Sequence, residues 1–225
     1  NNTIWTIEAL SNGEVWVGTS GGLSIYNKNT NNFTNYLNIF DRPRQGQVLS
    51  VLETSKAQVF IGTAAGIYAA KISDQGLNIS ILKGSEMLFV QDLEEGLANN
   101  ILVATRNSSI MDYSLIQDTF SYYLTTESDG ANDKNIRRLL FDNRGVLWVG
   151  TYNGLKIVNK DKSVVRLRAN IFNKKGLSKN SIKALFKDKK GSIWIGTYYG
   201  GINIWDETNV NFRTITQSLK GNGLR

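Results

Sequence analysis

Residues 136–155 read IRRLLFDNRGVLWVGTYNGL, and residues 182–202 read IKALFKDKKGSIWIGTYYGGI. Both stretches contain an apolar opening, a polar turn that ends in Gly, a W-x-G-T segment and a second glycine turn. Three weaker copies precede them, and the first residue of the W-x-G-T segment recurs at intervals of 44, 42, 46 and 46 residues. These residues are Trp16, Phe60, Leu102, Trp148 and Trp194. A period near 45 residues without a long helical pattern indicates an array of identical supersecondary units.

Each copy is predicted to form four short strands. The first strand opens on an apolar β-branched residue twelve positions before the W-x-G-T residue, namely Ile4, Val48, Val90, Ile136 or Ile182. A polar turn such as residues 142–145 follows, in which Asp can hydrogen-bond the turn backbone and Gly can adopt a positive φ. The W-x-G-T segment suits a half-buried second strand, and an alternating third strand and a short aromatic fourth strand come next. A four-stranded antiparallel unit at this period is typical of a β-propeller blade.

The sequence therefore predicts an all-β fold, a β-propeller with five four-stranded antiparallel blades. Residues 1–225 are expected to form one propeller region. The expected blades are residues 1–44, 45–86, 87–131, 132–176 and 177–225. Because the chain begins on a first strand and ends just past a fourth strand, we expect it to be a piece of a longer protein. A closed five-bladed ring is the alternative.

The recurring Trp and Gly of the W-x-G-T segment have structural interpretations. We expect the Trp residues to pack between neighbouring blades rather than to stack on a ligand, since they recur in every well-preserved copy. A glycine inside a strand usually marks the close approach of another part of the chain. Such crowding is expected of the inner strands near a propeller axis.

Two residue types are absent, and their absence restricts the possible chemistry. Without Cys the chain cannot build a disulfide framework or a thiolate metal site. Without His it has no imidazole for general base catalysis or metal binding. Carboxylate pairs could still serve a glycosidase, but turn chemistry explains Asp142 and Asp188. We therefore expect no catalytic residues, no cofactor and no metal site. No apolar stretch is long enough for a transmembrane helix.

Positive charge is concentrated in one part of the chain. Residues 134–190 carry 16 Lys and Arg against 3 Asp and Glu, a net charge of +13, while the rest of the chain carries 10 against 16, a net charge of −6. One interpretation is a solvated blade rim. The other is a surface that attracts an anionic polymer, such as a sulfated or uronic-acid glycan. Nucleic acid is not the expected partner, because no known reader motif is present.

One mouth of the propeller is the candidate binding face. The segments before the first strands and the loops after each G-T lie on the same side of an antiparallel blade, and they bring Arg106, Asn107, Asn135, Tyr152, Asn153, Asn180, Tyr198 and Tyr199 together. Aromatic rings beside amide and guanidinium groups form a plausible sugar platform. Interblade packing of Tyr198 and Tyr199 is the alternative. The second residue of each first strand varies, and Arg137 and Lys183 occupy that position; alternation does not decide whether they face a channel or solvent.

The repeated motif resembles the regulator-propeller repeat. The string N-x-I-x-x-L-x-x-D-x-x-G-x-[IL]-W-[IV]-G-T-x-x-G-[LI]-x-[IL] is matched almost throughout by the copies around Trp148 and Trp194. The first copy has Ser11 in place of the turn Asp, the second keeps F-I-G-T, and the third matches only in spacing. The resemblance covers essentially the whole chain. It is to the periplasmic sensor region of hybrid two-component systems in gut Bacteroidetes.

The resemblance implies a sensor. In such proteins seven-bladed propellers lie outside the inner membrane and precede a β-sandwich domain, a transmembrane helix, a histidine kinase and a DNA-binding regulator. The chain would then supply five blades of a seven-bladed or double propeller. Its expected location is the periplasm, in a parent that spans the inner membrane. Its expected function is to bind an oligosaccharide and to signal to the histidine kinase. The oligosaccharide would be acidic if the basic residues of 134–190 take part in binding.

Two other functions are weighed against the sensor. A non-catalytic propeller could be a scaffold for protein–protein interaction or receptor dimerisation, as repeat arrays commonly are. An enzyme is the third possibility, but the propeller lyases that resemble this repeat need a His general base, which is missing here. We also expect homodimers or self-association through open blade edges.

Overall fold

A computed structural model describes residues 3–37, 46–73, 76–106, 109–124, 135–170, 172–173, 175–206 and 209–216. All regular secondary structure in these residues is β-strand, and the strands form five four-stranded sheets. Each sheet takes its strands in chain order, and neighbouring strands pair antiparallel. The predicted all-β fold of five propeller blades is confirmed.

The blades follow one another along the chain. Blade 1 contains β1 (Ile4–Ala9), β2 (Val15–Thr19), β3 (Gly22–Asn27) and β4 (Asn32–Leu37). Blade 2 contains β5 (Val48–Glu53), β6 (Val59–Thr63), β7 (Gly66–Ser73) and β8 (Gly76–Ile81). Blade 3 contains β9 (Val90–Glu95), β10 (Asn100–Thr105), β11 (Met111–Ser114) and β12 (Thr119–Tyr122). Blade 4 contains β13 (Ile136–Phe141), β14 (Leu147–Thr151), β15 (Gly154–Val158) and β16 (Val164–Leu167). Blade 5 contains β17 (Ile182–Lys187), β18 (Ile193–Thr197), β19 (Gly201–Asp206) and β20 (Asn209–Ile215).

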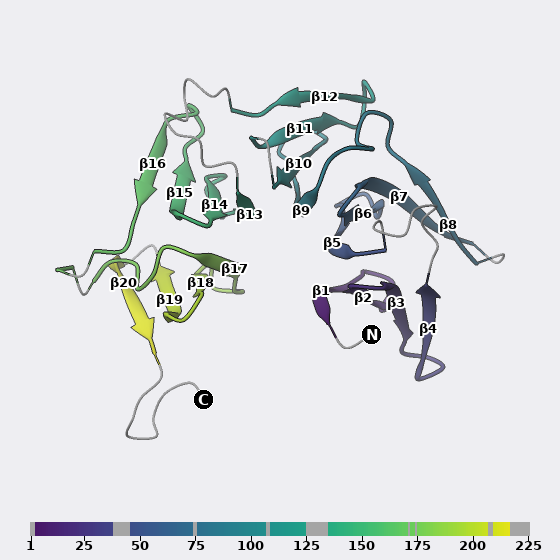
Figure 1. The fold of residues 1–225 in the computed structure, drawn as a ribbon, viewed down its shortest axis with the longest axis horizontal. Coiled ribbons are helices and arrows are strands. Elements are labelled where there is room, and N and C mark those ends of the chain that lie inside the picture. Colours follow the sequence, from purple (N-terminus) through teal and green to yellow (C-terminus); the bar gives the residue numbers. More distant parts are fainter. Residues whose placement is uncertain are drawn as a thin grey trace. The chain divides into compact units, whose positions relative to one another are not determined.

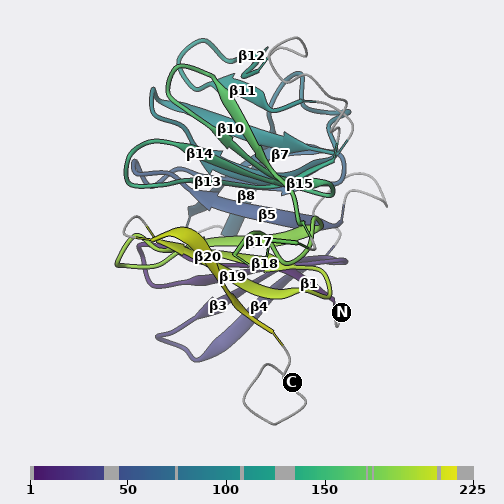
Figure 2. The same ribbon diagram turned by 90° about the vertical axis from the view of Figure 1, so that its left-hand side faces the viewer.

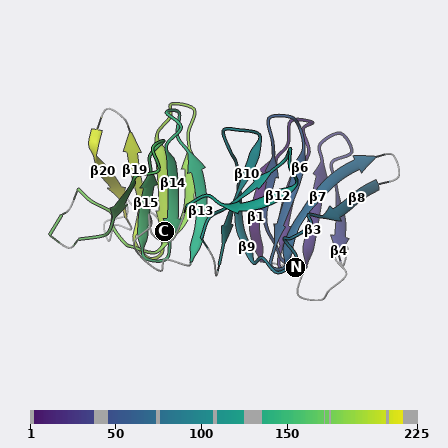
Figure 3. The same ribbon diagram turned by 90° about the horizontal axis from the view of Figure 1, so that it is seen from above.

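The chain divides into two compact units. Unit 1 comprises Asn1–Asn107 and Met111–Ser121 and holds blades 1 to 3, apart from the last residue of β12; unit 2 comprises Ser108–Ile110 and Tyr122–Arg225 and holds blades 4 and 5. Within unit 1 the first strands β1, β5 and β9 lie on the inner side of their blades, and β4, β8 and β12 lie on the outer side (Figure 1). Within unit 2 the sheets β13–β16 and β17–β20 stack as two layers (Figure 2), and β13 and β20 mark opposite sides of the unit (Figure 3).

Successive blades within a unit meet at a close joint. The β-branched residue that opens one blade packs over the W-x-G-T glycine of the blade before it. The pairs are Val48 over Gly18, Val90 over Gly62 and Ile182 over Gly150. A Cβ atom added at any of these glycines would come within 2.6 to 2.7 Å of the partner side chain. Only glycine leaves room for this approach, which agrees with the expectation that it marks crowded backbone.

The recurring tryptophans fill the same joints. Trp16 is 1 % exposed and shares a buried cluster with Val48 of blade 2, while Trp148 is 0 % exposed and shares one with Ile182 and Ile195 of blade 5. The interpretation of the recurring Trp as interblade packing is therefore confirmed for Trp16 and Trp148, whereas Trp194 of blade 5 is only partly buried. Burying a large aromatic ring at each joint contributes strongly to holding the blades together.

The hairpin turn of blade 4 supports its tryptophan as well as its own backbone. Asp142 accepts backbone N–H bonds from Arg144 and Val146, both at 2.9 Å, and accepts the indole N–H of Trp148 at 3.2 Å. Its carboxylate also forms an ion pair with Arg144 at 2.8 Å. Burial by itself would raise the pKa of Asp142, but these hydrogen bonds and the ion pair outweigh it and hold the pKa below its usual value.

The other turns show that the indole contact is a property of the repeat. In blade 5, Asp188 accepts the indole N–H of Trp194 at 2.9 Å. In blade 1, where Ser11 stands in the turn, Glu14 accepts the indole N–H of Trp16 at 3.1 Å. A carboxylate therefore accepts a hydrogen bond from each of these indole N–H groups. The hydrogen bond between Asp and Trp explains the spacing of these two residues in the motif, which the turn alone does not explain.

Candidate functional site

A β-bulge lies near the start of every first strand. In all five blades the register of the first strand against the second slips by one residue, so that the first strand carries one extra residue at that point. The residues at the shift are Trp5, Leu49, Gln91, Arg137 and Lys183. A bulge bends the strand and re-aims the side chain that it carries. This is why simple alternation could not assign a direction to Arg137 and Lys183.

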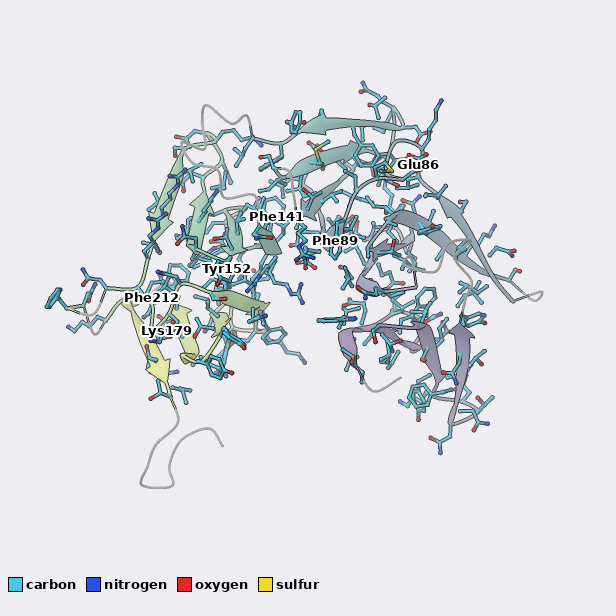
Figure 4. The ribbon with its side chains drawn as sticks, viewed as in Figure 1. Glu86, Phe89, Phe141, Tyr152, Lys179 and Phe212 are labelled. Carbon is cyan, nitrogen blue, oxygen red and sulfur yellow. The ribbon has the colours of Figure 1, made fainter. Side chains whose placement is uncertain are left out.

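In blade 4 the bulge residue contacts the loop that follows β14. The guanidinium carbon of Arg137 lies 5.0 Å from the ring centroid of Tyr152, which is a cation–π distance. The backbone N–H of Tyr152 donates to the carbonyl of Asn135 at 3.3 Å, so the loop and the start of β13 are tied together. Figure 4 shows Tyr152 beside the first strands β13 and β17, whereas Phe212 lies on the outer strand β20.

Blade 5 repeats this arrangement and extends it. The Nζ of Lys183 lies 5.0 Å from the ring centroid of Tyr198, and the ring of Tyr198 lies 4.2 Å from that of Tyr199. The backbone N–H of Tyr198 donates to the carbonyl of Ser181 at 2.8 Å, as Tyr152 does to Asn135. Ser181 is thus the structural counterpart of Asn135.

Arg137 links the two blades. Its Nη1 donates to Ser181 Oγ at 2.9 Å and to the carbonyl of Ile182 at 3.3 Å, both at the start of blade 5. These bonds place the guanidinium next to the bulge of β17. The cation–tyrosine cluster is defined here as Arg137, Tyr152, Lys183, Tyr198 and Tyr199, and it lies wholly within unit 2.

The three tyrosines of this cluster are exposed. Their exposed fractions are 60 % for Tyr152, 51 % for Tyr198 and 85 % for Tyr199. Neither Tyr198 nor Tyr199 is buried in a joint between blades 4 and 5, whereas Trp148 is fully buried there. Rings on the surface have faces that a ligand can cover.

The backbone of blade 5 holds Tyr199 in a strained conformation. Thr197 pairs with Gly201 across the hairpin, whereas Thr151 pairs with Gly154 in blade 4, so the loop of blade 5 is one residue longer. Tyr199 has a φ of 57°, in the left-handed region that bulky residues rarely adopt. Such strain costs on the order of 1 kcal/mol or more and clusters at functional positions.

Positive charges crowd one another in the cluster. Burial lowers the pKa of Lys183 below its usual value, and the charges of Arg137 and Arg138 lower it further. The hydrogen bond to Tyr199, then burial, then the charge of Tyr152 raise the pKa of Tyr198. An anion bound beside Lys183 would offset the repulsion between these cations.

The other predicted site residues have separate places. Asn135 and Asn153 are exposed at the same end of unit 2 as the cluster. Asn180 accepts the backbone N–H of Ala169 at 2.6 Å through its side chain, so it ties down the segment between β16 and β17. Arg106 is in unit 1, where its guanidinium lies 5.1 Å from the ring centroid of Phe89.

Asn107 lies outside the described residues. Ser181 is a site residue that the sequence motif does not predict, although its position immediately before Ile182 matches that of Asn135 before Ile136 and is a signal that could have found it. The described part of the chain contains no group of three or more Asp or Glu side chains placed to hold a metal ion. Within the same residues there is also no helix of the length and apolarity needed to cross a membrane.

Comparison with known proteins identifies the repeat. The family model described as two component regulator propeller matches residues 130–153 and 176–199. These segments contain β13 and β14 of blade 4 and β17 and β18 of blade 5. Blades 4 and 5 therefore each contain a segment similar to the two component regulator propeller family. No protein with a curated description matches the chain in sequence.

Several solved structures share the fold. The extracellular domain assigned to the hybrid two component system BT4673 of B. thetaiotaomicron superposes with a TM-score of 0.74 at 22 % identity, over 97 % of this chain and 28 % of that one. That of BT3049 from the same organism gives 0.75 at 19 % identity, over 100 % and 30 %. A streptogramin B lyase gives 0.67 at 16 % identity, over 95 % and 70 %. The chain thus spans less than a third of the two B. thetaiotaomicron domains.

Proposed function

We propose that this chain is part of the extracytoplasmic sensory region of a hybrid two-component system and binds an oligosaccharide there. The regulator propeller repeats and the two B. thetaiotaomicron extracellular domains of the same fold support the sensory role. In this proposal the parent protein spans the inner membrane, the chain lies in the periplasm, and binding changes the activity of a histidine kinase. The cation–tyrosine cluster is the observation that carries the binding part of the proposal.

The cluster has the groups that a sugar needs. The rings of Tyr152, Tyr198 and Tyr199 are exposed, and pyranose C–H groups pack on such faces while hydroxyl groups bond to neighbouring polar atoms. Arg137 and Lys183 already lie over two of these rings, so the aromatic faces and the donors converge on one end of unit 2.

An acidic sugar fits this cluster better than a neutral one. Among the described residues Lys183 makes no ion pair with a carboxylate, and burial, followed by the neighbouring cations, lowers its pKa. A carboxylate or sulfate on the ligand would stabilise the charged amine. The pKa of Lys183 should then rise when the ligand binds, because an opposite charge favours the charged form.

The proposed function is non-catalytic. The streptogramin B lyase shares the fold, but fold alone does not carry chemistry. The chain has no His to act as a base, and the cluster contains no carboxylate to replace it. Its polar groups are donors and phenols, which suit recognition of a bound molecule.

The test is calorimetric titration with matched oligosaccharides that differ only in whether a neutral hexose or a uronic acid occupies one position. Each titration is run at low and at physiological salt. We expect the acidic ligand to bind more tightly and to lose affinity as salt rises, because salt screens partly exposed charges. Lys183→Gln should weaken its binding about tenfold, in line with a partly desolvated ionic contact.

Lys162→Gln is the matched control. Lys162 also lies over a tyrosine, with its Nζ 3.0 Å from the ring centroid of Tyr123. Like Lys183, it belongs to unit 2 and to the basic stretch of residues 134–190. Its replacement should leave binding unchanged. Salt-insensitive binding of the neutral ligand that needs Tyr198 but not Lys183 would refute the acidic part of the proposal. Absence of binding for every oligosaccharide tested on the intact ectodomain would refute the proposal itself.

A further inference from the structure

A segment outside the strands of blade 5 supports the loop that joins β18 to β19. This loop, residues 198–200, carries two tyrosines of the cluster and is called the tyrosine loop here. The supporting segment, residues 175–181, directly precedes β17. Its Leu177 is 3 % exposed and packs in the buried cluster of the joint between blades 4 and 5, and Figure 4 shows Lys179 beside the strands of blade 5. The supporting segment is therefore anchored within unit 2.

A fully buried asparagine fastens the supporting segment to blade 5. Asn203 of β19 is 0 % exposed, and its Oδ1 accepts the backbone N–H and the hydroxyl group of Ser178, both at 3.0 Å. Its Nδ2 donates to Thr214 Oγ1 at 2.9 Å. Because a buried polar group is costly to leave unpaired, these bonds hold Ser178 firmly in place.

The repeat does not require an asparagine at this position. In the other blades the residue that pairs with the second residue of the W-x-G-T segment differs each time, namely Ser24, Tyr68, Met111 and Lys156. Asn203 has that position in blade 5, opposite Ile195. Its role is therefore particular to blade 5, where it holds Ser178.

Ser178 also contacts the threonine that closes the tyrosine loop. In blades 1, 2 and 4 the W-x-G-T threonine closes its own loop, because its Oγ1 donates to a glycine carbonyl and accepts a backbone N–H of the loop, at 2.8 to 3.1 Å. In blade 5 the loop is one residue longer, and Thr197 Oγ1 lies 3.1 Å from the carbonyl of Gly201 and 3.2 Å from Ser178 Oγ. The supporting segment thus supplies a contact that the shorter loops make by themselves.

Gly200 allows the supporting segment and the tyrosine loop to lie close together. A Cβ atom added there would come within 2.4 Å of Lys179 Cγ, 2.5 Å of Thr197 Oγ1 and 2.8 Å of Ser178 Oγ. Only glycine permits such an approach. The next residue toward the N-terminus is Tyr199, whose backbone is in the left-handed region. Strain of this kind persists only where the surrounding contacts hold it.

We propose that Ser178 is a positioning residue of the sugar site, which holds the two rings of the tyrosine loop where they meet a ligand. This proposal rests on the proposed function, because it concerns the same site. Ser178 is held by the buried Asn203, contacts the threonine that closes the loop and lies against Gly200. Tyr198 is tied to the same segment through the carbonyl of Ser181. The connection between blades 4 and 5 is thus part of the site, although it lies outside the repeated motif.

Two variants disturb this support from opposite sides. Ser178→Ala removes the hydroxyl group, and Gly200→Ala inserts a methyl group between the supporting segment and the tyrosine loop. Fluorine NMR of a fluorotyrosine incorporated in place of Tyr199 would report on the loop in the intact ectodomain. We expect both variants to move this signal, because the residue can then leave its strained conformation. The signal of a fluorotyrosine in place of Tyr152, in the loop of blade 4, should not move.

Ser163→Ala is the matched control. The hydroxyl group of Ser163 also makes a side-chain hydrogen bond within unit 2, at 2.6 Å to Asp161 in the turn between β15 and β16. Its removal should move neither fluorine signal. Circular dichroism and thermal unfolding of each variant check that the fold is retained.

The same variants are then titrated with the uronic-acid oligosaccharide used to test the proposed function. Ser178→Ala should bind it about fivefold more weakly, the factor that corresponds to one ordinary hydrogen bond, and Ser163→Ala should bind it like the unaltered protein. A Tyr199 signal that neither variant moves, or a moved signal with unchanged affinity, would overturn the proposal. If the unaltered ectodomain binds no oligosaccharide, the proposed function fails, while the fluorine signals still show whether Ser178 holds the tyrosine loop.

Discussion

Replacement of Gly150 by Ala tests the close joint between blades directly. The new Cβ atom would lie 2.7 Å from Ile182 Cγ2 and 3.2 Å from Ile182 Cβ. Favourable carbon–carbon contacts lie at about 3.5–4.0 Å, so the two side chains must separate by roughly 1 Å. Ile182 is 0 % exposed and sits in the cluster around Trp148, which leaves it no open direction to move.

The expected loss of stability follows from two opposing effects. Inserting a methyl group into a well-packed core costs about 1–3 kcal/mol. Gly→Ala also restricts the unfolded chain, which stabilises by about 0.4–1 kcal/mol. The free energy of unfolding should therefore fall by about 1–2 kcal/mol. For a domain of this size each kcal/mol shifts the midpoint of thermal unfolding by roughly 2–4 °C.

Gly196→Ala is the matched control within the same motif. Its Cβ atom would meet only Ala184 Cβ at 3.3 Å, beside an uncovered face. We expect no loss of stability, and a gain of up to about 0.5 kcal/mol from the unfolded chain. Urea unfolding followed by tryptophan fluorescence, at concentrations low enough to prevent association, would measure both variants. Equal effects of the two substitutions would refute the assignment of Gly150 to a steric role at the joint.

Three further outcomes are expected. Asp142→Ala should destabilise the chain by about 2–3 kcal/mol at neutral pH, measured by urea unfolding, because it leaves the indole N–H of Trp148 and the N–H of Val146 without their acceptor. The folded-state pKa of Asp142 is depressed, so its contribution should be complete above the ordinary pKa of about 3.9 and disappear as pH falls through the lower folded value. Acid unfolding of the alanine variant should lack this component. Burial, followed by the hydrogen bond and charge of Asp118, raises the pKa of Tyr113 to about 12. Its contribution is therefore present below about pH 10 and lost as pH rises toward 12. Ultraviolet titration should show a late phenolate, that of Tyr113, which Asp118→Asn shifts to lower pH.

Much of the candidate site can be placed from the sequence because it is tied to the repeat. Tyr152 and Tyr198 follow the W-x-G-T motif immediately, and hairpin geometry puts that position at one end of each blade. The role of Asn180 is not visible in this way, since its side chain bonds to Ala169, which lies outside the motif. The motif does not predict Ser181. The Asn of the repeat places Asn180 opposite Asn135 in the sequence alignment. The backbone hydrogen bonds from Tyr152 and Tyr198 instead show that Ser181 is the structural counterpart of Asn135.

The amino-acid pattern is sufficient to specify the fold and its repeating unit. The intervals between W-x-G-T segments, the turn residues and the two-residue alternation are all local properties, and each one specifies strands and hairpins without reference to the rest of the chain. The absence of His and Cys likewise restricts the chemistry through composition alone.

Which side chains meet is settled by contacts between strands and between blades. The bulges at Arg137 and Lys183 depend on the register between the first and second strands of their blades. A one-residue slip in that register reverses the direction of a side chain, and the amino-acid composition does not reveal it. The exposure of Ile4 and of the space above Gly196 likewise depends on what packs against each face. Local sequence specifies a blade, but packing between blades determines which of its equivalent surfaces are buried.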